Sequence, residues 1–169
     1  MDHFGQLNIL VYAAGTTLRR AAMLTSTENS RQLVAVNLEG VFSTTRACLR
    51  QMIKDHWGRI IILGSRAGRV GLPGESCYAA TKGALMAWAA SLAGEVGSRG
   101  ITVNVLSPGA LEGGETKYSD AEQEAVISKI GAGRLGTFEE VANVAVFLCS
   151  NRATYVNGAV IDVDGGARF

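Results

Sequence analysis

The segment Tyr78-Ala79-Ala80-Thr81-Lys82 carries the clearest chemical signal in this sequence of 169 residues. If the segment is helical, residues four apart share one face, so Lys82 lies one turn beyond Tyr78. A free tyrosine has a pKa of about 10, and a nearby ammonium lowers that pKa by favouring the phenolate. The pair therefore predicts a general acid–base catalyst. The same spacing taken alone is also typical of two exposed residues on a helix surface.

Two further polar residues could join this pair at one edge of a predicted sheet. Ser65 follows the apolar run 59–63, and open α/β sheets bind their ligands beyond the carboxyl ends of their strands. The Ser65 hydroxyl could therefore hydrogen-bond a substrate carbonyl. Asn37 lies in the middle of a predicted helix, where an amide side chain is a mediocre helix former. Its apolar neighbours Val36 and Leu38 favour a role in a site over a position facing solvent.

Strand-like and helix-like runs alternate along the chain. The expected strands are residues 7–11, 59–63, 101–106 and 159–163, and the expected long helices are 25–55 and 76–96. A short polar helix is expected from Asp120, and the capping-box spacings Thr25-x-x-Glu28 and Thr137-x-x-Glu140 mark two helix starts. Alternation of this kind, with strands that are apolar on both faces, predicts an α/β fold with a parallel sheet covered by helices.

Composition and charge exclude several classes of protein. The chain is 47% hydrophobic and 18% charged, with a net charge of +1, which argues against disorder and gives no general reason to bind nucleic acid or an anionic membrane. Cys48, Cys77 and Cys149 are widely spaced, so neither a disulfide framework nor a metal site is expected. With no basic signal region at the start and no apolar stretch long enough to span a membrane, we expect a cytoplasmic protein.

Several segments together resemble the short-chain dehydrogenase/reductase (SDR) family. The resemblance runs along almost the whole chain. It rests on Val36-Asn37-Leu38, Gly64-Ser65, Tyr78-Ala79-Ala80-Thr81-Lys82-Gly83-Ala84, Asn104-Val105-Leu106-Ser107-Pro108-Gly109, Arg134-Leu135-Gly136-Thr137 and Asp162-Val163-Asp164-Gly165-Gly166. The last two segments are most similar to the 3-oxoacyl-(acyl-carrier-protein) reductase branch. The resemblance implies a Rossmann-like, doubly wound parallel sheet and hydride transfer between NAD(P)(H) and a carbonyl or hydroxyl substrate, with a 3-oxoacyl thioester as one candidate.

The resemblance also implies roles for individual residues. Tyr78 would protonate the carbonyl oxygen in reduction or act as the base in oxidation. Lys82 would lower the pKa of Tyr78 and hydrogen-bond the nicotinamide ribose. Ser65 would orient the carbonyl, and Asn37 would hold a water that passes protons to Lys82. The residues implied to contact NADP or NAD are Ala14, Gly15, Tyr78, Lys82, Pro108 and Gly109, and the segment of about 111–136 would cover the substrate.

The chain departs from the family pattern at its start. The family's Gly-rich T-G-x-x-x-G-x-G turn is absent, and residues 7–11 correspond to the fourth strand of the family. The segment Tyr12-Ala13-Ala14-Gly15 stands where the family usually has Asn-Asn-Ala-Gly. Gly131-Ala132-Gly133-Arg134-Leu135-Gly136 fits G-x-G-x-x-G literally but follows a helical segment, so it is not expected to bind phosphate. We therefore expect residues 1–169 to form a partial domain with about four strands, without the N-terminal cofactor-binding third.

Two functions remain open on this evidence. The retained catalytic residues favour an SDR oxidoreductase, whereas the absent Gly-rich turn and the altered residues Tyr12 and Ala13 favour a non-catalytic or regulatory subunit that pairs with a full-length partner. Without the first three strands of the family, residues 7–11 become an open apolar edge, which invites pairing with another chain. The helices 25–55 and 76–96, which form the dimer interface in the family, make a homo- or hetero-oligomer plausible.

Overall fold

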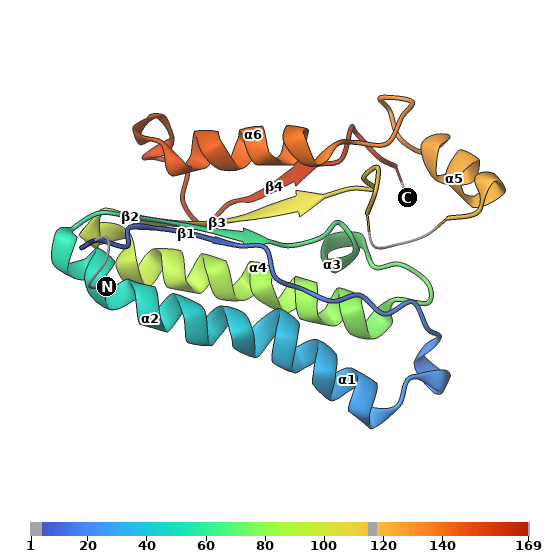
Figure 1. Cartoon of the computed structure of the whole chain (residues 1–169), viewed down its shortest axis with the longest axis horizontal. Coiled ribbons are helices and arrows are strands. Elements are labelled where there is room, and N and C mark those ends of the chain that lie inside the picture. Colours follow the sequence, from blue (N-terminus) through green and yellow to red (C-terminus); the bar gives the residue numbers. More distant parts are fainter. Residues whose placement is uncertain (1–4, 115–117, 169) are drawn as a thin grey trace.

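The computed structural model describes residues 5–114 and 118–168, which form a parallel sheet with helices on both faces (Figure 1). The four strands are β1 (Ile9–Tyr12), β2 (Gly58–Leu63), β3 (Ile101–Pro108) and β4 (Val160–Val163), in the order β1-β2-β3-β4. The α-helices are α1 (Thr27–Val34), α2 (Gly40–Asp55), α3 (Ala67–Val70), α4 (Ser76–Val96), α5 (Asp120–Ile127) and α6 (Phe138–Cys149). The predicted α/β fold with four parallel strands is confirmed.

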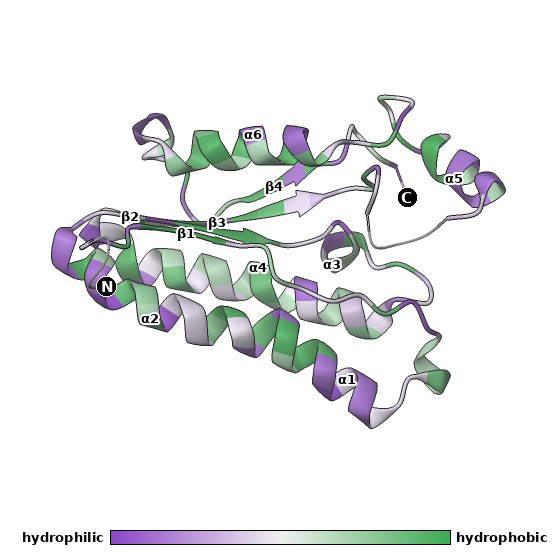
Figure 2. Ribbon diagram, viewed as in Figure 1, coloured by the Kyte–Doolittle hydropathy of each residue, from purple (hydrophilic) through white to green (hydrophobic). Residues whose placement is uncertain are grey.

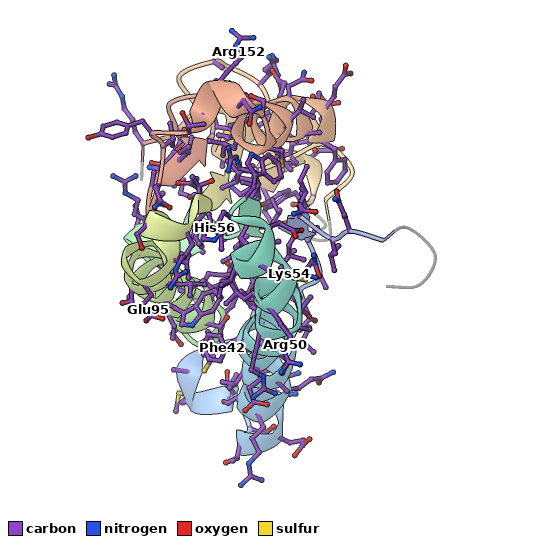
Figure 3. All side chains as sticks on the ribbon, turned by 90° about the vertical axis from the view of Figure 1, so that its left-hand side faces the viewer. Phe42, Arg50, Lys54, His56, Glu95 and Arg152 are labelled. Carbon is purple, nitrogen blue, oxygen red and sulfur yellow. The ribbon has the colours of Figure 1, made fainter. Side chains whose placement is uncertain are left out.

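The two long helices cover one face of the sheet, and α6 lies on the other (Figure 1). The predicted helix over 25–55 is present, but a π-helical turn, Ala35–Glu39, separates α1 from α2. The helix predicted over 76–96 coincides with α4. The rings of Phe42 on α2 and Trp88 on α4 lie 5.0 Å apart, and Figure 3 shows Phe42 between these helices. Among residues 5–114 and 118–168, no helix has the length and apolar character needed to cross a bilayer.

The start of α1 differs from the prediction. Ser26, not Thr25, is the N-cap residue, and its hydroxyl oxygen accepts a hydrogen bond from the Asn29 backbone N–H at 3.2 Å. The hydroxyl of Thr25 donates instead to the Ala21 carbonyl at 3.1 Å. The expected capping box of Thr25 and Glu28 is therefore wrong, because the preceding 3₁₀ turn, Ala22–Leu24, uses the Thr25 hydroxyl.

The predicted capping box at the start of α6 is confirmed. Thr137 accepts from the Glu140 backbone N–H at 3.2 Å, and the Glu140 carboxylate accepts from the Thr137 backbone N–H at 2.8 Å. The Arg134 guanidinium also donates to Glu140, and these hydrogen bonds lower the pKa of Glu140 to about 2. The carboxylate is therefore ionised at neutral pH, where it stabilises the positive end of the helix dipole.

The centre of the sheet is buried on both faces, as the continuous apolar runs predict. Ile60, Ile61 and Ile62 of β2 are fully buried, and so are Val103 and Val105 of β3. Ile60 and Ile62 pack with α2 and α4, whereas Ile61 packs with α6. Figure 2 shows this as hydrophobic colour along the strands between the helix layers. β2 and β3 are thus a rigid base for the loops that leave their carboxyl ends.

Among the described residues β1 pairs with β2 alone, so its other edge is open, and that edge is apolar, as predicted. Leu10 and Tyr12 pack against the core, whereas the alternate residues Ile9 and Val11 are each 45% exposed. Val11 also lines an apolar groove of about 620 Å³, which the exposed side chains of Phe138 and Val146 of α6 line as well. An unpaired strand edge next to an apolar groove is a ready surface for association.

We expect the purified chain to elute as an associated species, larger than its monomer mass of 17.8 kDa. The change Ile9→Lys should shift the population towards monomer, because a lysine on an edge strand opposes strand pairing. Size-exclusion chromatography with light scattering measures the mass. Met23→Lys is the matched control, since Met23 is 91% exposed and lies outside β1. A clean monomer of the unaltered chain would contradict this expectation.

Candidate active site

Tyr78 and Lys82 lie at the first turns of α4, next to the carboxyl end of β2. The Lys82 ammonium donates a hydrogen bond to the Leu63 carbonyl at 2.7 Å, and Leu63 is the last residue of β2. Its Nζ atom lies 5.9 Å from the centroid of the Tyr78 ring. Lys82 is only 5% exposed. The alternative of a solvent-exposed lysine on a helix surface is therefore wrong.

Asn37 is buried and held by hydrogen bonds. Its Oδ1 atom accepts from the Thr16 backbone N–H at 2.8 Å, and its Nδ2 atom donates to the Thr16 carbonyl at 2.9 Å. Nδ2 also donates to the Thr81 hydroxyl at 3.1 Å. Asn37 lies in the π-helical turn Ala35–Glu39, and such turns are frequent at functional sites. The alternative of an Asn37 that faces solvent is excluded, since only 1% of its surface is exposed.

Gly15 brings Asn37 and Lys82 to one point. A Cβ atom built on Gly15 would lie 3.4 Å from Asn37 Oδ1 and 3.5 Å from Lys82 Nζ. Three segments far apart in the sequence therefore meet here: the loop after β1, the π-helical turn and α4. The absence of a side chain at Gly15 leaves room directly over the ammonium and the amide. The structure thus brings together three residues that the sequence assigned to one site.

Ser65 lies in the loop after β2. Its hydroxyl oxygen accepts from the Ala67 backbone N–H at 3.2 Å, a contact at the start of α3. The next residue, Arg66, donates its backbone N–H to the Pro108 carbonyl at 3.1 Å. This bond joins the loop of Ser65 to the end of β3, where Pro108 and Gly109 follow each other. Ser65 therefore lies at the same edge of the sheet as Lys82, beside the residues predicted to contact the nicotinamide.

Thr81 is a site residue that the sequence reasoning missed. Its hydroxyl donates to the Tyr78 carbonyl at 2.8 Å and accepts from Asn37 Nδ2. It therefore connects the helix turn of Tyr78 with the buried amide. Its place inside the Tyr78–Lys82 segment was visible in the sequence, but nothing in the helical period assigned its hydroxyl to Asn37.

Two ion pairs fix the loop after β2 against the end of the chain. Arg66 pairs with Asp164, and Arg69 of α3 pairs with Asp162 of β4. The Arg66 and Asp164 side chains are only 15% and 8% exposed. Because that pair is largely withdrawn from solvent, removing either partner would leave a charge that is buried and uncompensated.

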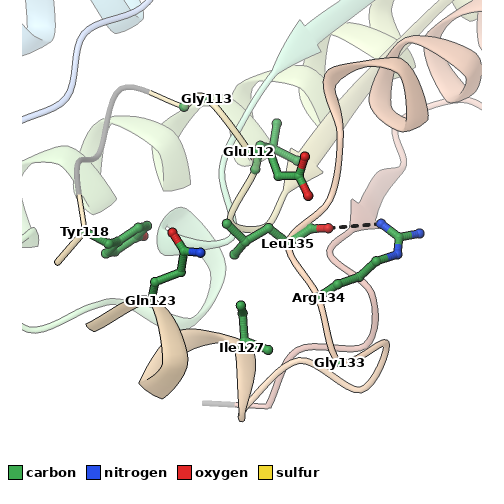
Figure 4. Close-up of a pocket in the computed structure, with 10 residues that line it drawn as sticks. Glu112, Gly113, Tyr118, Gln123, Ile127, Gly133, Arg134 and Leu135 are labelled. Carbon is green, nitrogen blue, oxygen red and sulfur yellow. Dashed lines mark hydrogen bonds between the residues drawn. The ribbon is translucent and has the colours of Figure 1, made fainter. Parts of the chain in front are cut away.

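The segment of about 111–136, predicted to cover the substrate, contains α5 and a pocket of about 350 Å³. Residues 115–117 of this segment lie outside the described residues. Figure 4 shows Tyr118, Gln123 and Ile127 on one side of the pocket and Glu112 on another, with the Arg134 guanidinium hydrogen-bonded to the Leu135 carbonyl.

Gly131, the first glycine of the G-x-G-x-x-G match, does not lie at a helix start. It packs against the backbone of Gly165 and Gly166.

The edge of the sheet offers a cradle that fits the nicotinamide half of a dinucleotide. Ala14 and Gly15 follow β1, and Pro108 and Gly109 lie at and after the end of β3. Because β2 lies between these strands, the two pairs flank the Ser65 loop that follows β2. Gly109 packs closely against Asp164, since a Cβ atom at Gly109 would lie 2.9 Å from Asp164 Cα. Parallel sheets bind nucleotides in this crevice beyond the strand ends. The side-chain-free backbone at Gly15, beside the Lys82 ammonium, suits the hydroxyl groups of a ribose.

Comparison with known proteins gives the same family by three routes. A family model described as enoyl-(acyl carrier protein) reductase matches residues 1–168. The 3-oxoacyl-(acyl-carrier-protein) reductase FabG of Escherichia coli (strain K12) is 42% identical over 164 residues, which cover 96% of this chain and 67% of that protein. The protein of the same name from Pseudomonas aeruginosa is 41% identical over 166 residues, covering 98% of this chain and 67% of that protein.

A solved structure extends the likeness to the fold. The crystal structure of a 3-oxoacyl-(acyl-carrier protein) reductase from Brucella melitensis ATCC 23457 matches with a TM-score of 0.92 at 30% sequence identity. The match covers 96% of this chain and 63% of that one, so the chain spans about two thirds of the length of its relatives. The chain therefore belongs to the short-chain dehydrogenase/reductase family, and its predicted resemblance to the 3-oxoacyl-(acyl-carrier-protein) reductase branch is confirmed.

Proposed function

We propose that this chain catalyses the reduction of a carbonyl group at the expense of NADPH or NADH, with a 3-oxoacyl thioester as the substrate class. The observation that carries the proposal is the meeting of Asn37 and Lys82 under Gly15, one helix turn from Tyr78. Buried groups of this kind at the carboxyl edge of a parallel sheet are typical of a catalytic site. The substrate class rests on the names of the relatives.

In this proposal Tyr78 is the general acid. Its hydroxyl gives a proton to the carbonyl oxygen as the carbonyl carbon is reduced. The Lys82 ammonium, fixed by the Leu63 carbonyl, places a positive charge beside the ring and thereby favours the phenolate that the transfer leaves. When bound, the nicotinamide supplies the hydride. Lys82 and Tyr78, with Ala14, Gly15, Pro108 and Gly109, would hold it.

The remaining site residues position the substrate and return the proton. The Ser65 hydroxyl would donate its proton to the carbonyl oxygen and polarise it, while its own oxygen still accepts from the Ala67 N–H. Asn37 would hold the water through which a proton returns to Lys82 and then to Tyr78. The segment of about 111–136 would close over the acyl chain and exclude water from the reaction.

A second function keeps support from one observation. The open β1 edge and the apolar groove beside α6 are a surface suited to a partner. A non-catalytic or regulatory subunit would need such a surface. The reductase is favoured, because a subunit that only binds has no need of a buried lysine fixed next to a tyrosine.

A nicotinamide titration followed by a turnover assay distinguishes the two functions. We expect nicotinamide fluorescence to report binding weaker than micromolar, because the family's Gly-rich turn is not in this sequence. Turnover of a short 3-oxoacyl thioester should accordingly rise in proportion to the NADPH or NADH concentration. Micromolar binding would contradict the first expectation. Absence of turnover at every nicotinamide concentration would refute the reductase proposal and favour the subunit.

A further inference from the structure

The π-helical turn that holds Asn37 leaves one carbonyl without its ordinary partner. In an α-helix the Gly40 N–H would bond the Val36 carbonyl, four residues back. Here the Gly40 N–H bonds the Ala35 carbonyl, five residues back. The carbonyl of Val36 is therefore displaced from the helical ladder, and a half-buried carbonyl of this kind needs another donor.

Tyr12 supplies that donor. Its hydroxyl donates to the Val36 carbonyl at 3.1 Å, although the two residues are 24 positions apart in the sequence. Tyr12 is the last residue of β1, and its ring packs against the core between the sheet and the long helices. The bond thus connects the end of β1 to the turn that carries Asn37.

Gly40 makes room for this contact. A Cβ atom at Gly40 would lie only 2.3 Å from the Tyr12 hydroxyl oxygen, so any larger residue would push the hydroxyl away. The glycine also follows the π-helical turn directly, where its N–H makes the five-residue bond. Tyr12 and Gly40 therefore fit each other and the irregular turn.

We propose that Tyr12 is a positioning residue for Asn37: its hydroxyl bonds the carbonyl displaced by the π-helical turn and so keeps the turn in the form that aims the amide of Asn37 at Thr16. Without this donor, the turn gains by returning to α-helical bonding, in which the Gly40 N–H satisfies Val36. The hydrogen-bonded turn then spans four residues instead of five. Asn37 is thereby rotated about the helix axis relative to Gly15 and Lys82. The consequence for proton return rests on the proposed function, whereas the geometry does not.

The test is the change Tyr12→Phe, read by NMR on the isotope-labelled chain without nicotinamide or substrate. The Thr16 N–H donates to Asn37 Oδ1, so its hydrogen exchange should become about tenfold faster when the amide turns away. The side-chain amide resonances of Asn37 should shift as well. The Val105 N–H, in the centre of the sheet, reports global stability and should exchange at an unchanged rate. Tyr155→Phe is the control, because Tyr155 is fully exposed.

The proposal is overturned if Thr16 and Asn37 behave in Tyr12→Phe as they do in Tyr155→Phe, or if Thr16 and Val105 accelerate together. The change Gly40→Ala should give the same response as Tyr12→Phe, since it displaces the hydroxyl while keeping the tyrosine. Should neither variant fold, a crystal structure of the unaltered chain decides: a Tyr12 hydroxyl turned away from Val36 refutes the proposal. These readouts need no turnover, so they stand apart from the success or failure of the proposed reductase.

Discussion

Replacing Tyr78 with phenylalanine is expected to lower the rate of carbonyl reduction at least about a hundredfold, because general acid catalysis contributes factors of about 10² to 10⁴. The change removes the hydroxyl that gives the proton and leaves the ring, which lies near the Lys82 ammonium, in place. The Thr81 contact is made to the Tyr78 carbonyl and survives. The loss of reduced nicotinamide with a 3-oxoacyl thioester, followed by absorbance, gives kcat/KM.

Tyr155→Phe serves as the matched control for this change. Tyr155 is fully exposed and lies outside the site, so its loss of a hydroxyl should leave kcat/KM unaltered. Circular dichroism and the urea midpoint should agree for both variants and the unaltered chain. If Tyr78→Phe keeps the turnover of the control, Tyr78 is not the acid.

The change Gly68→Ala is expected to lower both stability and turnover. A Cβ atom there would lie 2.6 Å from the Gly83 backbone nitrogen and 2.6 Å from the Lys82 carbonyl carbon. These are backbone atoms of α4 that cannot rotate aside, so α3 must move away from α4. Forcing atoms into a packed contact costs about 1–3 kcal/mol in the free energy of unfolding. The displacement also separates the loop of Ser65 from Lys82, so kcat/KM should fall as well.

Gly94→Ala is the control, because Gly94 lies on α4, the helix that Gly68 contacts, and beyond the neighbouring turns of that helix no atom lies within 4 Å of the added methyl group. An alanine at an open helical position is expected to raise the free energy of unfolding by about 0.5–1 kcal/mol. Urea denaturation compares the two variants. Equal stability of Gly68→Ala and Gly94→Ala would show that α3 and α4 are not held at the distance the structure gives.

Most of the fold was readable from local patterns. The long apolar α4 begins and ends where the sequence predicts it. The continuous apolar residues 60–62 predicted a strand that is buried on both faces. The π-helical turn was not readable, because the partner of its displaced carbonyl, Tyr12, comes from a distant strand. The N-cap of α1 was misplaced by one residue because the capping-box spacing Thr25-x-x-Glu28 favoured Thr25, although serine is the better N-cap residue. A preceding turn decided between them.

The site was predictable in its residue types but not in its supports. Spacing alone placed Tyr78 and Lys82 on one helix face, and the strand end placed Ser65 at the right edge. The carbonyl of Leu63 that holds Lys82, and the closeness of Gly15 to both Lys82 and Asn37, depend on how β1, β2 and α4 pack together. Backbone groups and glycines carry no chemical signature in a sequence, so such contacts emerge only from the assembled fold.

The strand order β1-β2-β3-β4 has a consequence for synthesis on the ribosome. Each of β2, β3 and β4 pairs with the strand made before it, so its neighbour is already present when it emerges. Each pairing still has to close a loop of tens of residues, as parallel strands require. The four residues proposed for catalysis, Asn37, Ser65, Tyr78 and Lys82, all precede residue 83. The residues proposed for catalysis therefore emerge before β3 and before the segment of about 111–136 that would cover the substrate.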